Sequence, residues 1–245
     1  MNILQKFSTR MILNKNSKSY NVTVIALLSI LLIIGGFMSI SIGSANIPLS
    51  DIISAIKQGD HTSKTYAIIM FVRIPRTLAA ILAGCALSVS GAILQSVLNN
   101  SLASPNVIGV NSGAGLFTVL IAAFFPASLH LTTVAAFTGA ILAVFLVYFI
   151  AQKIGASRMT IVLSGIAVSS FIGAITDTVL TLKPDTVIAR TAFLIGGFSG
   201  ITMEKISFAG WFIILAFLTA LIISYDMNIL ALGDESAKSL GLNVI

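Results

Sequence analysis

The sequence is poor in charge and nearly free of cysteine. Only 9% of its 245 residues carry a formal charge, whereas 57% are hydrophobic. Soluble domains carry about 25% charged residues, so this composition excludes a soluble enzyme and a disordered chain. The single cysteine, Cys85, excludes an intrachain disulfide framework and a cysteine metal cage. The composition therefore indicates an integral membrane protein.

Basic residues outnumber acidic ones, but they are scattered along the chain. The net charge is +6, from 14 basic and 8 acidic residues. No basic run is dense enough to bind a phosphate backbone, so no nucleic-acid partner is expected. The sequence has no HExxH or CxxC motif, and its two histidines, His61 and His130, stand alone. We therefore expect no catalytic residue, no metal site and no bound cofactor.

Long uncharged stretches make up most of the chain. From Thr77 to Gln152 no residue carries a formal charge, and about 20 apolar residues suffice to cross a bilayer. Polar turns at residues 99–101 and 126–130 divide this stretch into three. With three further apolar stretches, the pattern predicts six membrane helices, at residues 22–42, 77–98, 106–125, 131–150, 159–180 and 206–225. The predicted fold class is all-α, a polytopic transmembrane helix bundle.

A basic tail, residues 1–21, precedes the first predicted helix and contains no acidic residue. The apolar segment after it is longer than the roughly 7–15 residues of a cleaved signal, so we interpret it as a retained helix. Over the whole chain the basic residues divide equally between the two sides of the membrane, so the positive-inside rule does not decide the orientation. Only the acid-free tail favours a cytoplasmic amino terminus.

Small residues recur at four-residue spacing on four predicted helices, which favours close helix packing. These stripes are Ala80/Gly84/Ser88, Gly109/Gly113, Ala135/Gly139/Ala143 and Gly165/Ser169/Gly173. They are typical of a tight helix bundle of any function. Two polar residues within the helices, Gln95 and Asn111, are expected to form interhelical hydrogen bonds.

Three segments, in this order along the chain, resemble one known family. The first is RIPRTLAA at residues 73–80, which leads into SGAILQ at 90–95. The second is NSLASP at 100–105, followed by IGVNSGA at 108–114, and the third is ALGDESAKSLG at 231–241. Together they resemble the permease subunits of ATP-binding-cassette (ABC) importers for iron-siderophores, haem and cobalamin. Family members carry Asn-Pro-Leu-Ala where this chain has Ser101 in place of the proline.

The resemblance assigns roles to particular residues. It implies that Arg73 and Arg76, on either side of Pro75, reach outward and pair with acidic residues of an extracytoplasmic binding protein. It implies that residues 233–241 form a cytoplasmic coupling helix that docks in a groove of the ATPase. The coupling residues are Gly233, Asp234, Glu235, Ala237, Leu240 and Gly241. The residues of the family's turn and helix packing are Gly84, Gly91, Gln95, Asn100, Leu102, Ala103, Pro105, Gly109 and Gly113.

The physical character of the third segment suits this coupling role. Asp234 and Glu235 favour the start of a helix, and Gly241 can end it. Ala237 and Leu240 lie three residues apart, which predicts a small shared apolar face. The segment is therefore expected to work through its shape and packing rather than through reactive groups.

The resemblance also implies a function. The chain would be a permease subunit, not an enzyme, in a bacterial or archaeal cell membrane with a cytoplasmic amino terminus. Two permeases would pair around a central path, while a separate ATPase dimer uses ATP and a binding protein delivers the cargo. A ferric siderophore is the favoured cargo, ahead of haem and cobalamin.

The family has ten helices, so residues 1–245 are interpreted as its amino-terminal portion, from a fragment, a truncated gene product or a split one. Two alternatives stay open at this point. One is a secondary carrier or channel, complete with six helices and driven by an ion gradient. The other is a truncated permease that folds but is inactive.

Overall fold

The computed structural model of the chain is helical throughout the part that it describes. That part comprises residues 18–43, 45, 47–48, 51, 54, 63–101, 103–126, 129–155 and 157–242. Most of the predicted cytoplasmic tail lies outside it. The chain divides into two compact units, the first within residues 1–81 and 199–208 and the second within residues 82–198 and 209–245.

The first unit is built around the end of helix α2, which spans Lys18–Ser41. A second helical run follows, and its three parts are α4 (Lys64–Ile68), the π-helix η1 (Ile69–Arg73) and α5 (Ile74–Leu98). The side chain of Ile69 is buried and packs against Ile40 at the end of α2 and against Tyr66. This run begins at Lys64, earlier than the predicted start at residue 77.

The helical run can begin before Pro75 because a π-turn precedes this proline. Proline lacks an N–H, and in an α-helix its ring clashes with the carbonyl four residues earlier. In the preceding π-turn the hydrogen bonds reach back five residues, and the N–H of Ile74 bonds to the carbonyl of Ile69. Such local widening accommodates proline inside membrane helices. Pro75 is therefore an interior residue of the helix.

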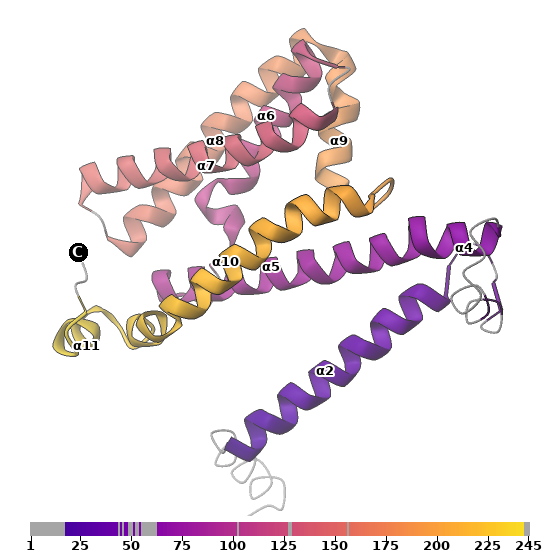
Figure 1. The fold of residues 1–245 in the computed structure, drawn as a ribbon. Coiled ribbons are helices and arrows are strands. Elements are labelled where there is room, and N and C mark those ends of the chain that lie inside the picture. The colour runs from indigo at the N-terminus through magenta and orange to yellow at the C-terminus, as the bar shows by residue number, and fades with distance from the viewer. Residues whose placement is uncertain are drawn as a thin grey trace, which may run out of the picture. The chain divides into compact units, whose positions relative to one another are not determined.

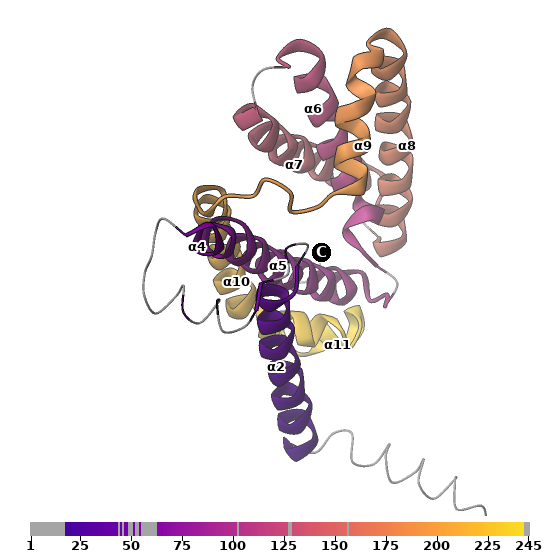
Figure 2. The same ribbon diagram turned by 90° about the vertical axis from the view of Figure 1, so that its right-hand side faces the viewer.

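The second unit contains a packed group of four helices, which lie together in both views (Figures 1 and 2). They are α6 (Val110–Phe124), α7 (Leu129–Ile154), α8 (Arg158–Leu182) and α9 (Val187–Ile195). Their buried core consists of Leu116 from α6, Ala143 and Val147 from α7, and Val168 and Ile172 from α8. Helices α6, α7 and α8 thus share one buried core.

The third predicted crossing, 106–125, is interrupted near its start. A 3₁₀-helix, η2, spans Pro105–Ile108, and Gly109 adopts a left-handed conformation with φ 79° before α6 begins. Helix α6 has 15 residues, which span about 22 Å, less than the ~30 Å of a hydrocarbon core. The expected spanning helix is thus replaced by a short helix with a bent entrance.

The remaining helices belong mostly to the second unit, and the chain passes through the first unit again only at residues 199–208. A 3₁₀-helix, η3 (Pro184–Thr186), leads into α9, which the sequence reading missed. Helix α10 spans Met203–Leu230, and α11 spans Asp234–Ser239. Residues 203–208 of α10 belong to the first unit and the rest to the second.

Large apolar side chains remain exposed along the long helices. Ile222 on α10, for example, is 79% exposed. Among the described residues, five helices are long and apolar enough to cross a membrane, namely Ser19–Ser41, Lys64–Leu98, Leu131–Ile154, Arg158–Leu182 and Met203–Leu230. An exposed apolar surface of this extent is suited to contact with lipid.

Candidate functional site

The two arginines beside Pro75 lie in different environments. Arg73 is only 6% exposed, because its guanidinium turns toward the end of α2. Its Nη1 donates to the carbonyl oxygens of Ile40 at 2.7 Å and Ser41 at 2.8 Å, and its Nη2 donates to that of Ala45 at 2.5 Å. The last carbonyls of a helix lack partners within the helix. Arg73 therefore caps α2.

Gly43 allows the guanidinium of Arg73 to approach this closely. A Cβ at Gly43 would lie 3.0 Å from Nη2 of Arg73, so a larger residue would require the guanidinium to shift by a few tenths of an ångström. The expectation that both arginines reach outward from one side does not hold for Arg73, because its guanidinium donates three hydrogen bonds to carbonyls of its own chain.

Arg76, by contrast, is exposed. Its Nη2 lies 3.5 Å from the hydroxyl of Ser199, at the limit of a hydrogen bond. Arg76 also lines a hollow of about 210 Å³ between the end of α2 and η1. The docking role inferred for the arginine pair stays a prediction, and the geometry favours Arg76 as the residue free to meet a partner.

The family-turn residues divide into open and packed positions. Gln95 and Asn100 are exposed, Ala103 is buried, and Pro105 starts η2. Leu102 lies outside the described residues. At Gly84 and Gly91, an added Cβ would meet no described atom within 4 Å. These two glycines of α5 are therefore not packed against any residue that the structure describes.

Glycines on α6, α7 and α8 form the close contacts of the second unit. A Cβ at Gly113 would collide with the backbone oxygen of Gly139, and one at Gly139 would collide with that of Gly113. A Cβ at Gly165 would collide with the carbonyl of Val107 in η2. Backbones that meet this closely leave no room for a side chain. The side-chain amide of Asn111 donates to the side-chain oxygen of Asn106 in η2, five residues earlier, rather than to a distant membrane helix.

The predicted coupling segment contains a short helix, α11, that follows directly on α10. Gly233 precedes it with φ 100°, a conformation that favours glycine, and Gly241 follows it with φ 88°. Asp234 and Glu235 occupy its first turn, where acidic side chains are favourable. The two glycines thus set where the short helix turns away from α10 and where it ends.

The two apolar residues of this segment do not share one exposed face. Ala237 is fully buried at 0% exposure, whereas Leu240 is 61% exposed. Ala237 therefore packs α11 against its own chain, and Leu240 is available to a partner. The sequence reading placed both on one face because it assumed a regular helix through residue 240, but α11 ends at Ser239.

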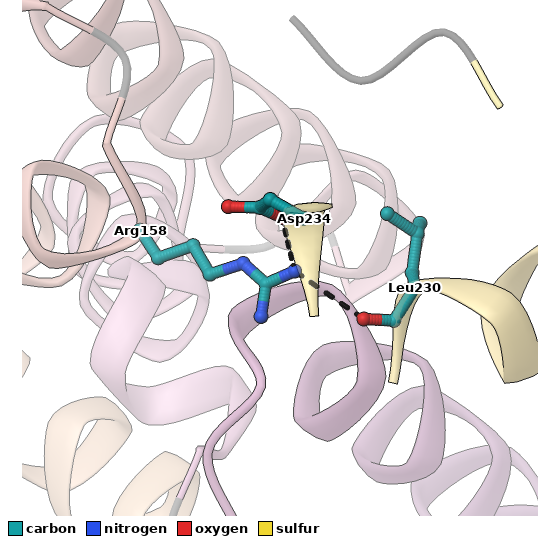
Figure 3. Close-up of polar contacts among 3 residues, drawn as sticks. All are labelled: Arg158, Leu230 and Asp234. Atoms are coloured by element: carbon teal, nitrogen blue, oxygen red, sulfur yellow. Dashed lines mark hydrogen bonds and ion pairs between the residues drawn. The ribbon is translucent and has the colours of Figure 1, made fainter. Parts of the chain in front are cut away.

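A residue that the sequence reading missed, Arg158, contacts the first residue of α11. The Nη2 of Arg158, at the start of α8, lies 2.5 Å from Oδ1 of Asp234 and 3.3 Å from the carbonyl oxygen of Leu230 (Figure 3). Among the residues with described placement, no group of three or more His, Cys, Asp or Glu side chains is arranged to hold a metal.

Comparison with known proteins identifies the family. The sequence matches the FecCD transport family over residues 31–245. It is 33% identical over 230 residues to the Fe(3+)-citrate import system permease protein YfmD of Bacillus subtilis, covering 94% of this chain and 68% of that protein. It is 34% identical over 220 residues to the ferric enterobactin transport system permease protein FepD of Escherichia coli, covering 89% and 66%.

A solved structure agrees with these sequence relationships. An inward-facing structure of a metal-chelate type ABC transporter superposes with a TM-score of 0.76 at 27% sequence identity, covering 90% of this chain and 68% of that one. The chain spans about two thirds of the length of these relatives. The resemblance inferred from the three sequence segments is thereby confirmed, and the chain belongs to the FecCD transport family.

Proposed function

We propose that this chain is the membrane-spanning permease part of an ABC importer that moves a ferric chelate into the cytoplasm. The family match over residues 31–245 carries the proposal. Relatives named for ferric citrate, ferric enterobactin and iron-hydroxamate support a ferric chelate, such as a ferric siderophore, as the cargo. In this proposal two permeases pair, an ATPase dimer uses ATP, and a binding protein delivers the chelate.

Contacts within each unit support the proposed topology. Arg158 and Asp234 are in contact although α8 and α10 separate them along the chain. If both helices cross the bilayer, Arg158 and Asp234 lie on the same side of the membrane. We take this side as cytoplasmic because α11 is the proposed coupling helix. The Arg76–Ser199 contact similarly puts these two residues on one face, which we take as the outer face. The amino terminus is then cytoplasmic.

A transport assay tests this function against the ion-driven alternative. The protein is reconstituted in liposomes with its ATPase and binding protein, and uptake of a radiolabelled ferric chelate is measured. We expect uptake only when ATP and the binding protein are both present. Uptake driven by an ion gradient without ATP would contradict the proposal, because a secondary carrier needs no ATPase.

The arginine pair offers a test of docking with a built-in contrast. Arg76→Glu is expected to lower uptake at limiting binding-protein concentration at least tenfold, about 1.4 kcal/mol or more, because it reverses an exposed charge. Its melting temperature in detergent should be unchanged. Arg73→Glu is expected to lower the melting temperature, because its carboxylate would face the carbonyls of Ile40 and Ser41 at the end of α2 and that of Ala45 beyond it.

Two results would count against this division of roles. One is wild-type uptake by the Arg76→Glu protein at limiting binding protein. The other is a wild-type melting temperature for the Arg73→Glu protein, which would mean that the cap on α2 contributes nothing measurable.

A further inference from the structure

The guanidinium of Arg158 joins three helix ends. It belongs to the first residue of α8, it reaches the last carbonyl of α10 at Leu230, and it pairs with Asp234, the first residue of α11. Figure 3 shows the side chain extending between these two partners. The Arg158 side chain is 22% exposed and that of Asp234 is 49% exposed. The junction is thus at the surface of the second unit rather than in its core.

Helix electrostatics indicate that the contacts with α10 and α11, and not α8 itself, favour a positive charge at Arg158. The amino-terminal end of a helix disfavours a cation, and Arg158 follows directly on Ser157, whose hydroxyl caps α8 through the N–H of Thr160. The carboxyl-terminal end of α10 and the acidic start of α11 both favour a cation. The contacts across helices therefore account for the charge at residue 158.

Such a half-exposed ion pair contributes little to stability. Its main effect is geometric, since it fixes the direction of a helix of only six residues that follows the glycine at 233. The other end of the connection is firm, because Val168 and Ile172 of α8 lie in the core shared with α6 and α7. Arg158 thus connects a short, glycine-flanked helix to the packed helix group.

We propose that Arg158 is a positioning residue that fastens α11 to α8, so that movement of α11 is passed to the packed helices instead of being lost at Gly233. This inference rests on the proposed function, in which α11 contacts the ATPase. Without the pair, the ATPase would still bind α11, but its closure would move the short helix without moving α8. ATP hydrolysis and transport would then become uncoupled.

The test compares charge variants in the full reconstituted complex. Arg158→Gln is expected to retain ATPase co-purification but to raise the ATP hydrolysed per chelate transported at least threefold. The charge swap Arg158→Asp with Asp234→Arg should bring this ratio back toward the wild-type value, because it restores an opposite-charge pair. Lys153→Gln removes an exposed basic residue from the last turn of α7 and is expected to leave the ratio unchanged.

The outcomes separate this inference from the proposed function. If wild-type protein shows ATP-dependent uptake and Arg158→Gln has a wild-type ratio, the positioning role is overturned. The same holds if Arg158→Gln raises the ratio and the swap fails to lower it, since only a general structural defect would then explain the change. If wild-type protein captures no ATPase, the proposed function itself fails.

Discussion

Replacing Gly165 with alanine is expected to remove most of the folded protein from the membrane. The new Cβ would collide with the carbonyl oxygen of Val107 and lie 3.2 Å from Cα of Ile108. Both are backbone atoms of η2, which cannot rotate away as a side chain would. Overpacking costs about 1–3 kcal/mol, and a backbone collision belongs at the upper end of that range. The yield of monodisperse protein and its melting temperature in detergent measure the effect.

Gly173 on the same helix provides the matched control. An added Cβ there meets no described atom within 4 Å, and alanine is favoured over glycine in a helix by about 1 kcal/mol. Gly173→Ala should therefore keep or raise the melting temperature. If the two variants behaved alike, the close approach of α8 to η2 would be wrong.

Placing glutamate at Leu240 is expected to abolish ATPase capture while leaving the permease as stable as wild type. Leu240 is 61% exposed, so its loss removes an apolar contact for a partner without disturbing the chain's own packing. If Leu240 is one of the few hot-spot residues of the interface, its loss costs about 2 kcal/mol or more, which corresponds to more than a tenfold loss of affinity. Co-purification of the ATPase and the melting temperature of the permease are measured together.

Ala237→Glu should lose the ATPase by a different route. Ala237 has no exposed surface, so a glutamate would force a charge into a packed position and displace α11. Capture and melting temperature should both fall. Ser239→Glu, at an exposed position of the same helix, is expected to retain the ATPase. Full capture of the ATPase by the Leu240→Glu protein would contradict the prediction that Leu240 contacts the ATPase.

Composition and hydropathy predicted the class of fold well. An apolar composition and a fold of spanning helices have the same cause, because lipid surrounds the chain. Five of the six predicted stretches coincide with long helices, since a backbone in lipid has to satisfy its own hydrogen bonds. The sixth, residues 106–125, contains η2 and the short helix α6 instead. The ends were harder to predict. The run from Lys64 to Leu98 passes through Pro75 because a π-turn precedes it, and no simple sequence pattern signals such a turn.

Other misses concern short elements and contacts between distant residues. Helix α9 lies between two crossings, and its signal was a short apolar pattern that ends at the paired glycines 196 and 197. The family segments predicted a coupling region at residues 233–241, which stays a prediction, and the structure added that Ala237 is buried and Leu240 exposed. The partner of Asp234 is Arg158, 76 positions earlier. A single sequence does not indicate which residues so far apart come into contact. The burial of Arg73 likewise depends on where α2 ends.

The π-turn at η1 changes how the two halves of its helical run are oriented. A π-turn holds about one residue more than an α-turn, and one residue corresponds to a rotation of about 100° in an α-helix. Residues 64–68 and residues 74–98 are therefore out of phase, and a single helical wheel drawn through both assigns the wrong lipid-facing side to one of them. A one-residue deletion within residues 69–73 would bring the two segments into phase and rotate residues 64–68 about the helix axis.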